Sequence, residues 1–538
     1  MNQPKPHSIN FKTLISDIEQ GRIKIPQFQR EFVWSKESSA KLIDSILKGY
    51  PIGTFILWKT QERLRSVRNI GGLDIPETPA GDSVYYVLDG QQRITSLFAS
   101  IKGVSIKREK SEDNFEEMYI DLDATDEDDI VIIDTDGKNN ESIVKLTELY
   151  KGRGSLYAKY DEKYHEKIDD YKDLLSAYEF SVIDVNNSSI DVATEIFTRL
   201  NVGGKSLTLF EIMVAKTYDM ERNFDLSVKY DELIERLSNV NYDTIPASVV
   251  LQSVAMCIDK QCTKKSILKL DKNEFIDNWD KVADSIERTV DYFRTFFRIP
   301  VSNLLPYNSL IVPFTYYFYH HKDKPLDAQK DYLQDYFWRA SLSERFSNAT
   351  EQKLANDVKG IDDILNNKEP KYDFQVDIRP ISIINKGYFN TSSGYIKSIL
   401  CLYASKEPKS FIDDSIVKID NNYLKISSSR NYHHFFPKAY LEKQGVDYSK
   451  INNVVNITLV DDFLNKRIIR AKDPAKYMSS FKEQNVDLDR TMKTHLINNL
   501  DEFGVWNNDY DKFIDKRAQA IHDEIKKRII IRDIDIID

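Results

Sequence analysis

The sequence predicts a multidomain α/β protein with an α/β N-terminal part, a helical middle and a C-terminal part organised around a pair of histidines. Three observations predict this arrangement. A chain of 538 residues exceeds what one hydrophobic core can serve. Strand and helix patterns alternate up to Leu200, and apolar residues then recur at helical spacing from Phe210 to about Asn367. We therefore expect domains over residues 1–209, 210–370 and 371–538.

The composition is that of a folded, water-soluble protein, with 41% apolar and 30% charged residues. No stretch approaches the roughly 20 apolar residues of a membrane span, and the start of the chain lacks the apolar region of a signal peptide. Three cysteines form no Cys-x-x-Cys pair, which indicates a reducing compartment and argues against a structural zinc site. We therefore expect a cytoplasmic protein. Its net charge of −10 implies that any contact with nucleic acid is local.

The first elements follow from local patterns. Residues 11–18 have a helical pattern, and Ser35 is placed to cap a second helix whose apolar residues share one face. The β-branched and aromatic residues of Ile52–Trp58 predict a strand.

The stretch Val84–Phe98 is the more informative part of this region. A strand over Val84–Leu88 runs directly into Asp89-Gly90-Gln91-Gln92-Arg93 and then into a helix. A strand that breaks at glycine and opens a helix directs backbone N–H groups at the break, an arrangement that suits a phosphate. Arg93 adds a fork of donors, and Asp89 can accept a hydroxyl or a metal. The alternative is an ordinary capped strand-to-helix turn.

The later part of the first 370 residues also has strand and helix patterns. A strand over Phe180–Val185 precedes a helix over Asp191–Leu200, whose C-terminal end carries Arg199 and Asn201. The helical middle contains a second histidine pair, His320-His321, at the end of an aromatic helical segment, where packing or capping of the helix is the better interpretation.

The C-terminal part centres on residues 431–467. His433 and His434 are adjacent, and Asn456 and Asn465 follow. In an extended segment the two histidines point to opposite faces, so one can face a metal held with Asn465 while the other faces an attacking water. Phosphodiester hydrolysis needs both a divalent metal and a neutral base. Between Lys425 and Lys476 there are 10 Lys/Arg and 5 Asp/Glu, so the segment is basic in an acidic chain. The alternative is a histidine pair in an aromatic turn, satisfied by backbone hydrogen bonds.

His433-His434-Phe435-Phe436-Pro437 with Asn456 and Asn465 resembles the HNH (ββα-metal) nuclease motif at the C-terminus of GmrSD-like, modification-dependent (type IV) restriction endonucleases. The resemblance implies that His434 is the general base, that His433 and Asn465 bind the metal, and that Asn456 braces the catalytic loop. Many relatives have Asp or Glu at this position, and the histidine of this chain would shift the metal preference from Mg²⁺ toward softer ions. Cationic side chains for the DNA phosphates would come from Lys466, Arg467, Lys472 and Lys476.

Four earlier segments are similar, in order, to motifs of the GmrSD-like N-terminal domain: Ile25–Arg30, Tyr50–Gly53, Asp89–Arg93 and Phe197–Asn201. The resemblance implies a ParB/sulfiredoxin-like fold associated with nucleotide binding or hydrolysis and with sensing of modified DNA. The nucleotide-binding residues would be Gln29, Arg30, Asp89, Gly90, Gln91, Gln92, Arg93, Arg199 and Asn201.

The leading hypothesis is a metal-dependent DNA endonuclease of anti-phage defence, also an NTPase, that cleaves modified phage DNA under the control of GTP or ATP. Its cofactors would be Mg²⁺ or Mn²⁺ and the nucleotide, and two copies would suit a double-strand cut. One alternative is an NTP-switched DNA-binding protein whose HNH domain does not cleave. The other is a nickase or RNase toxin.

Overall fold

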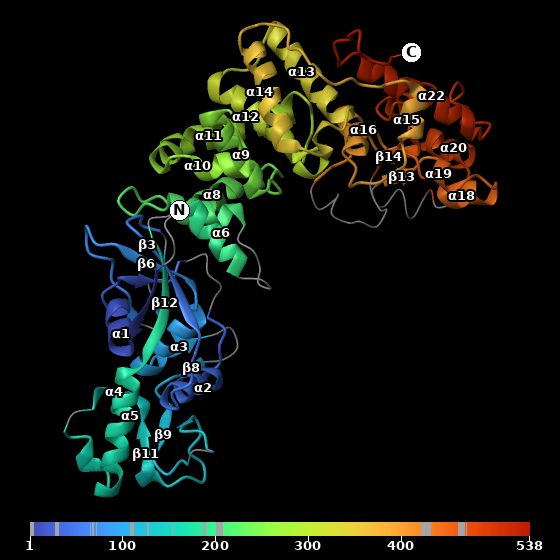
Figure 1. Cartoon of the computed structure of the whole chain (residues 1–538). Coiled ribbons are helices and arrows are strands. Elements are labelled where there is room, and N and C mark those ends of the chain that lie inside the picture. The colour runs from blue at the N-terminus through green and yellow to red at the C-terminus, as the bar shows by residue number, and fades with distance from the viewer. Residues whose placement is uncertain are drawn as a thin grey trace. The chain divides into compact units, whose positions relative to one another are not determined.

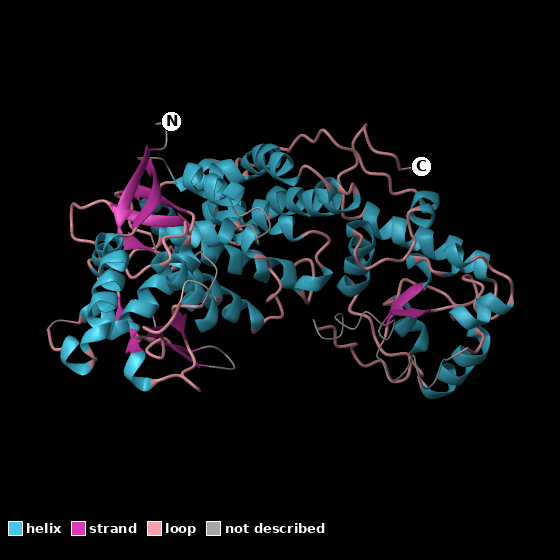
Figure 2. Cartoon of the chain, turned by 60° about the horizontal axis from the view of Figure 1, so that its bottom comes forward, coloured by secondary structure: helices cyan, strands magenta, loops and turns pink. Residues whose placement is uncertain are grey.

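The computed structural model describes residues 5–26, 32–64, 66, 69–70, 73–107, 112–125, 128–152, 154–186, 190–200, 208–420, 432–460, 469 and 471–537. The chain divides into two compact units, Met1–Leu226 (unit 1) and Ser227–Asp538 (unit 2). An α/β region with a mixed five-stranded sheet makes up the N-terminal part, and the remainder is largely helical. Figure 2 shows this contrast between strands near the N-terminus and helices elsewhere. The finer domain boundaries at 209 and 370 stay predictions.

The sheet of unit 1 has the strand order β1, β12, β3, β6, β2. β1 and β12 are antiparallel, β12 and β3 parallel, β3 and β6 antiparallel, and β6 and β2 parallel. Figure 1 shows the three central strands side by side. The strands are β1 (Lys5–Asn10), β2 (Ile23–Lys24), β3 (Thr54–Thr60), β6 (Val84–Asp89) and β12 (Glu179–Asn186).

Helices cover the sheet because its strands alternate buried and exposed residues. In β12, the buried Phe180 and Val182 alternate with the exposed Glu179 and Ser181. The two buried residues belong to the same core as Phe11 of α1. The predicted cap at Ser35 is confirmed, since its side chain accepts a hydrogen bond from the backbone N–H of Ser38. The helices are α1 (Phe11–Glu19), α2 (Lys36–Leu47), α3 (Gln91–Lys102), α4 (Leu146–Lys151), α5 (His165–Ala177), α6 (Ile190–Leu200) and α7 (Leu209–Thr217).

Smaller sheets extend unit 1. Asp44 of α2 ties one of them to the main core, because its Oδ1 accepts hydrogen bonds from the N–H groups of Ile130 and Val131 at 2.6 and 3.2 Å. These strands are β4 (Asn69–Ile70), β5 (Leu73–Asp74), β7 (Ser105–Lys107), β8 (Glu112–Asn114), β9 (Tyr119–Asp121), β10 (Val131–Ile132) and β11 (Ile143–Lys145).

Unit 2 is helical around an aromatic core. The ring of Phe297 stacks on that of Phe337 with centroids 4.2 Å apart, and Phe293 meets Phe314 edge-on at 4.9 Å. The helices are α8 (Leu226–Ser238), which begins at the unit boundary, α9 (Ala247–Asp259), α10 (Lys264–Lys269), α11 (Lys272–Thr295), α12 (Ile311–His320), α13 (Asp327–Leu342), α14 (Thr350–Leu365), α15 (Pro380–Asn385), α16 (Gly394–Ser405), α18 (Lys438–Lys443), α19 (Tyr448–Ile451), α20 (Pro474–Gln484), α21 (Leu488–Lys493) and α22 (Tyr510–Lys526).

The second histidine pair packs at the end of α12, as expected. His321 is the C-cap residue of the helix, and the ring of His320 lies 4.6 Å from that of Tyr316. Burial lowers the pKa of His320. This pair therefore serves the packing of the helix.

A buried ionic network fastens residues 529–537 onto α13. Arg339 and Asp535 are fully buried, and the two guanidinium Nη atoms donate to the two carboxylate oxygens at 2.6 and 2.8 Å. Asp335, also fully buried, accepts from Arg532 at 2.9 Å. Alternating apolar and charged residues make this segment look like a strand, but it forms only an isolated bridge between Asp377 and Ile536. Arg532 and Asp535, two of the charged residues in this segment, take part in the buried ion pairs.

The three cysteines, Cys257, Cys262 and Cys401, are free thiols and all are buried. Burial raises the pKa of each thiol, to about 12 for Cys262.

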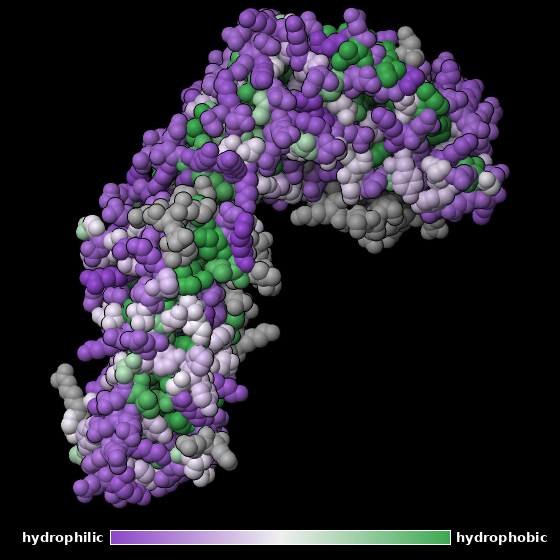
Figure 3. Space-filling view, viewed as in Figure 1, coloured by the Kyte–Doolittle hydropathy of each residue, from purple (hydrophilic) through white to green (hydrophobic). Residues whose placement is uncertain are grey.

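Hydrophilic residues cover most of the face of unit 2 drawn in Figure 3. None of the helices that the structure describes combines the length and apolar composition needed to cross a bilayer.

Candidate functional site

The histidine pair lies on a short antiparallel strand pair in unit 2. β13 (Tyr432–His434) pairs with β14 (Ile457–Leu459), so that His433 is opposite Thr458 and His434 is opposite Ile457. The side chain of His433 is buried, whereas His434 is partly exposed. The two imidazoles therefore occupy different environments, as the alternation of an extended strand requires.

A hydrogen bond from His434 to Asn452 determines which ring nitrogen of His434 carries the proton. Asn452 donates from Nδ2 to the carbonyl of Phe389 at 3.2 Å, which turns its Oδ1 toward His434. That Oδ1 lies 3.2 Å from Nε2 of His434, so Nε2 carries the proton and Nδ1 carries the lone pair. Burial lowers the pKa of His434, although the bond to Asn452 works in the opposite direction. The imidazole is thus held in the neutral form that a general base needs.

Asn456 shapes the turn beside the histidines. Its side chain is fully buried. Its Oδ1 accepts from the N–H of Phe436 at 2.9 Å, and its Nδ2 donates to the carbonyls of Phe436 and Ile451 at 3.1 and 3.2 Å. These bonds join the segment after β13 to the turn before β14, while the catalytic role expected for Asn456 stays a prediction.

A buried arginine donates hydrogen bonds to the backbone of this turn. Arg517 of α22 has no exposed surface, and it donates to the carbonyls of Val455 and His495 at 2.6 and 3.2 Å. Its guanidinium lies 4.6 Å from the centre of the Tyr403 ring. Two carbonyls and an aromatic ring thus hold the cation next to Asn456.

The metal site expected from the sequence is described only at His433. The ring of His433 is 2% exposed and lies 6.3 Å from that of Tyr477. Asn465, its expected partner, lies outside the described residues, as do Lys466 and Arg467. In the part of unit 2 that is described, no three His, Cys, Asp or Glu side chains gather as a metal site.

Lys472 and Lys476, the other predicted phosphate contacts, are exposed at the start of α20. Asp473 caps this helix by accepting a hydrogen bond from the backbone N–H of Lys476 at 2.9 Å. Tyr477 of the same helix donates to the carbonyl of Phe435. The helix is therefore fixed to the segment that follows His434.

Exchange of Asn452 tests whether it positions His434. Asn452→Asp adds a negative charge beside the imidazole and raises its pKa, so the acidic limb of the pH–rate profile of DNA cleavage should move to higher pH by about one unit. Asn452→Leu removes the hydrogen bond that raises the pKa, so the limb should move to lower pH, with a rate roughly 10–100-fold lower. Identical profiles for both variants would contradict this role.

In unit 1, the segment Asp89–Arg93 joins β6 to α3 as predicted. Gly90 is the N-cap of α3 with φ 95°, a left-handed conformation that favours glycine, and a Cβ there would lie 2.4 Å from Phe55. Gln91 and Gln92 are buried, and Oε1 of Gln92 accepts from the N–H of Val33 at 2.8 Å. The turn is thus linked to the segment that follows the first motif.

Arg93 holds the second motif. Its Nη1 donates to the carbonyl of Ile52 at 2.6 Å, and its Nη2 donates to the carbonyl of Thr54 and to Asp89, both at 3.1 Å. Gly53 leaves room for this contact, since a Cβ there would lie 2.4 Å from Nη1. The guanidinium therefore joins motifs that are 39 residues or more apart in the sequence.

Arg93→Ala should loosen this region. The carbonyls of Ile52 and Thr54 lose a partly buried partner, which should lower the stability of unit 1 by about 1–3 kcal/mol and weaken any response to nucleotide. Arg93→Lys should restore little of the lost stability, because an ammonium group lacks the planar set of donors with which the guanidinium binds two carbonyls. Urea unfolding of the full chain, with the exposed Lys107→Ala as control, measures the effect. Equal stability of Arg93→Ala and Lys107→Ala would refute it.

The remaining predicted nucleotide-binding residues are less well placed. Arg199, at the end of α6, has a 79% exposed side chain and pairs with Glu195 at 2.6 Å. Among the described residues, no hydrogen bond joins Arg199 to Asp89–Arg93. Gln29, Arg30 and Asn201 lie outside the described residues.

The sequence of unit 1 is similar to a known domain. Residues 11–218 match the N-terminal domain of the GmrSD restriction endonucleases. The match ends close to the boundary of unit 1 at Leu226. The chain is also 25% identical over 542 aligned positions to an uncharacterized protein of Methanocaldococcus jannaschii, an alignment that covers 88% of this chain and 87% of that protein.

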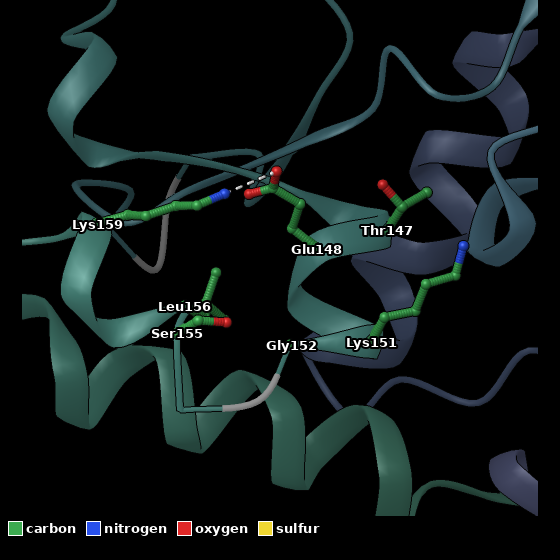
Figure 4. Close-up of a pocket in the computed structure, with 7 residues that line it drawn as sticks. All are labelled: Thr147, Glu148, Lys151, Gly152, Ser155, Leu156 and Lys159. Atoms are coloured by element: carbon green, nitrogen blue, oxygen red, sulfur yellow. Dashed lines mark hydrogen bonds and ion pairs between the residues drawn. The ribbon is translucent and has the colours of Figure 1, made fainter.

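Unit 1 also contains a hollow of about 350 Å³ between α4 and the turn that follows it. Figure 4 shows Lys159 reaching to Glu148 on one side of the hollow, with Ser155 and Leu156 facing it from the turn. Lys159 donates to Glu148 at 3.1 Å. The hollow is lined by none of the residues predicted to bind nucleotide.

Sequence reasoning missed three residues near the candidate nuclease site: Asn452, Arg517 and Lys438. Asn452 is the first residue of an Asn-Asn pair just before Asn456, a visible signal whose partner His434 lies 18 positions away. Lys438 helps to lower the pKa of His434 through its charge. Arg517 gave no signal, because an isolated arginine on a helix is usually exposed.

Proposed function

We propose that the protein is a metal-dependent endonuclease that cleaves modified DNA, with nucleotide binding or hydrolysis in the GmrSD N-terminal domain controlling the cut. The family match supports a modification-dependent restriction role. The observation that carries the nuclease half is His434, an imidazole whose Nε2 proton is held by Asn452 and whose pKa is lowered by burial.

The chain's own residues would act as follows. His434 takes a proton from the attacking water at Nδ1, and Asn452 keeps the ring in that orientation. Asn456 fixes the turn, and Arg517 supports it from α22. His433 and Asn465 would hold a divalent ion such as Mg²⁺ or Mn²⁺, which neutralises charge on the scissile phosphate. Lys472 and Lys476 would contact neighbouring phosphates.

Cleavage of matched phage DNA samples tests the proposal. Modified and unmodified DNA are incubated with the full chain and Mg²⁺ or Mn²⁺, with GTP, with ATP and without nucleotide. We expect cutting of modified DNA alone, with a rate that changes when one of the nucleotides is added. Equal cutting of both DNA samples would reject modification dependence, and a rate insensitive to both nucleotides would reject the control by unit 1.

A second candidate function is an NTP-switched DNA-binding protein without cleavage. The near-complete burial of His433 favours it, because a metal ligand must reach an ion. Under this alternative, His434→Ala leaves phage restriction unchanged in cells, whereas the nuclease proposal requires that restriction be lost.

A further inference from the structure

Two hollows in unit 2 share a strongly basic lining. The larger, about 490 Å³, lies where the C-terminal ends of α11, α16 and α22 meet, and the smaller, about 290 Å³, adjoins it. Arg298 lines both. Six cationic residues and two glutamates line the pair, in a chain whose net charge is −10. We call the cations together the basic trough: Arg294, Arg298, Lys406, Lys418, Lys527 and Arg528.

The cations of the basic trough outnumber the two glutamates that could neutralise them. Three cations surround the single carboxylate of Glu524: Arg528 at 2.7 Å, Lys527 at 2.8 Å and Lys406 at 3.3 Å. Burial would raise the pKa of Glu524, but hydrogen bonds from Lys527 and Arg528 lower it to about 2. The carboxylate is therefore ionised and offsets one charge of three. If the cations served only to join α16 to α22, one of them would be enough.

The position of the basic trough distinguishes a long anion from a small one. Phe513 of α22 stacks on Phe435, the residue after His434, with ring centroids 4.8 Å apart. Lys527 follows the end of the same helix, about 20 Å farther along at 1.5 Å per residue. A DNA duplex covers that length in about six base pairs. A duplex is therefore long enough to span both ends of α22, whereas a single phosphate or nucleotide is not.

We propose that the basic trough binds the phosphodiester backbone of DNA several base pairs away from the bond to be cut. The inference rests on the proposed function for the choice of DNA as the polymer. It adds a second place of contact, remote from His434, that would hold the duplex in register with the nuclease site.

Two residues allow the trough to be changed with little harm to the fold. Lys527 has a 66% exposed side chain, and its neighbour Lys526 is exposed on the same turn of α22 but does not line the hollows. Lys527→Glu and Lys526→Glu therefore form a matched pair with the same change in charge. Arg298 has φ 55°, which glycine adopts readily, so Arg298→Gly removes a cation without straining the backbone.

The experiment measures binding of a labelled DNA duplex to the full chain by fluorescence anisotropy at several salt concentrations, in EDTA so that no cutting occurs. Lys527→Glu and Arg298→Gly should each raise the Kd at least about fivefold. Each should also lower the slope of log Kd against log salt concentration by about one, since one phosphate contact is lost. Lys526→Glu should bind as the unchanged protein does. Unchanged affinity in the first two variants, or equal weakening in all three, would overturn the proposal.

A second arm separates DNA from small anions. The melting temperature of each protein is measured with and without inorganic phosphate and ATP. If phosphate or ATP stabilises the unchanged protein, and both trough variants lose that effect while keeping their DNA affinity, the trough is a small-anion site and the proposal is wrong. The proposed function is judged separately, by cleavage in His434→Ala, which leaves the trough intact.

Discussion

His434→Ala is expected to lower the rate of DNA cleavage by roughly 10²–10⁴-fold, the usual contribution of a positioned general base. The physical reason is the loss of the only imidazole on β13 that is both partly exposed and held neutral by burial. The measurement is the single-turnover rate of plasmid cutting at pH 7.5 with saturating Mn²⁺.

The control for this prediction is a measurement of whether the His434→Ala variant keeps its fold. Asn456 and Arg517 hold the turn without help from the imidazole of His434, so the variant should unfold at nearly the same urea concentration as the unchanged protein. Addition of free imidazole should restore part of the lost rate if a base alone is missing. A variant that folds normally and cuts at the original rate would show that His434 is not the base.

Asp535→Ala is expected to lower the stability of unit 2 by about 3–5 kcal/mol, because it removes one partner of a buried ion pair and leaves the guanidinium of Arg339 without its bidentate carboxylate. Arg339 is fully buried, and besides Asp535 it is bound by the carbonyl of Ile530 at 2.8 Å and by Asp335 at 3.4 Å. These two contacts cannot replace a bidentate carboxylate. Urea unfolding of the full chain, followed by tryptophan fluorescence, measures the loss.

Two comparisons sharpen this result. Asp533→Ala, at an exposed position two residues away, should change stability by less than about 0.5 kcal/mol. The double variant Arg339→Met with Asp535→Leu should recover much of the stability, because a well-packed apolar pair often replaces a buried ion pair without loss. Equal effects of Asp535→Ala and Asp533→Ala would show that the ionic network contributes little.

Local chemistry was predictable where one short segment determines its own structure. Ser35 caps α2, and Gly90 lies between β6 and α3 as the N-cap of α3, both as the sequence indicates. The periodicity of the middle segments likewise predicted helices that the structure contains. In these cases the deciding contacts join residues a few positions apart.

Contacts between distant residues were not predictable in the same way. The four donors of the Arg93 fork were visible in the sequence, but not that the carbonyls of Ile52 and Thr54 would take them. Asp535 pairs with Arg339 across 196 positions, a contact that nothing in the local sequence indicates. Roles of His433, His434 and Asn465 stay predictions, since the last of these lies outside the described residues.

The burial of all three cysteines makes the two units accessible to spectroscopy. Because Cys257, Cys262 and Cys401 are shielded and their thiols resist ionisation, a maleimide dye or spin label should attach only to cysteines introduced on the surface. One label in each unit would then report, by energy transfer or electron resonance, whether nucleotide changes the separation of unit 1 from unit 2. No native thiol needs to be removed for that measurement.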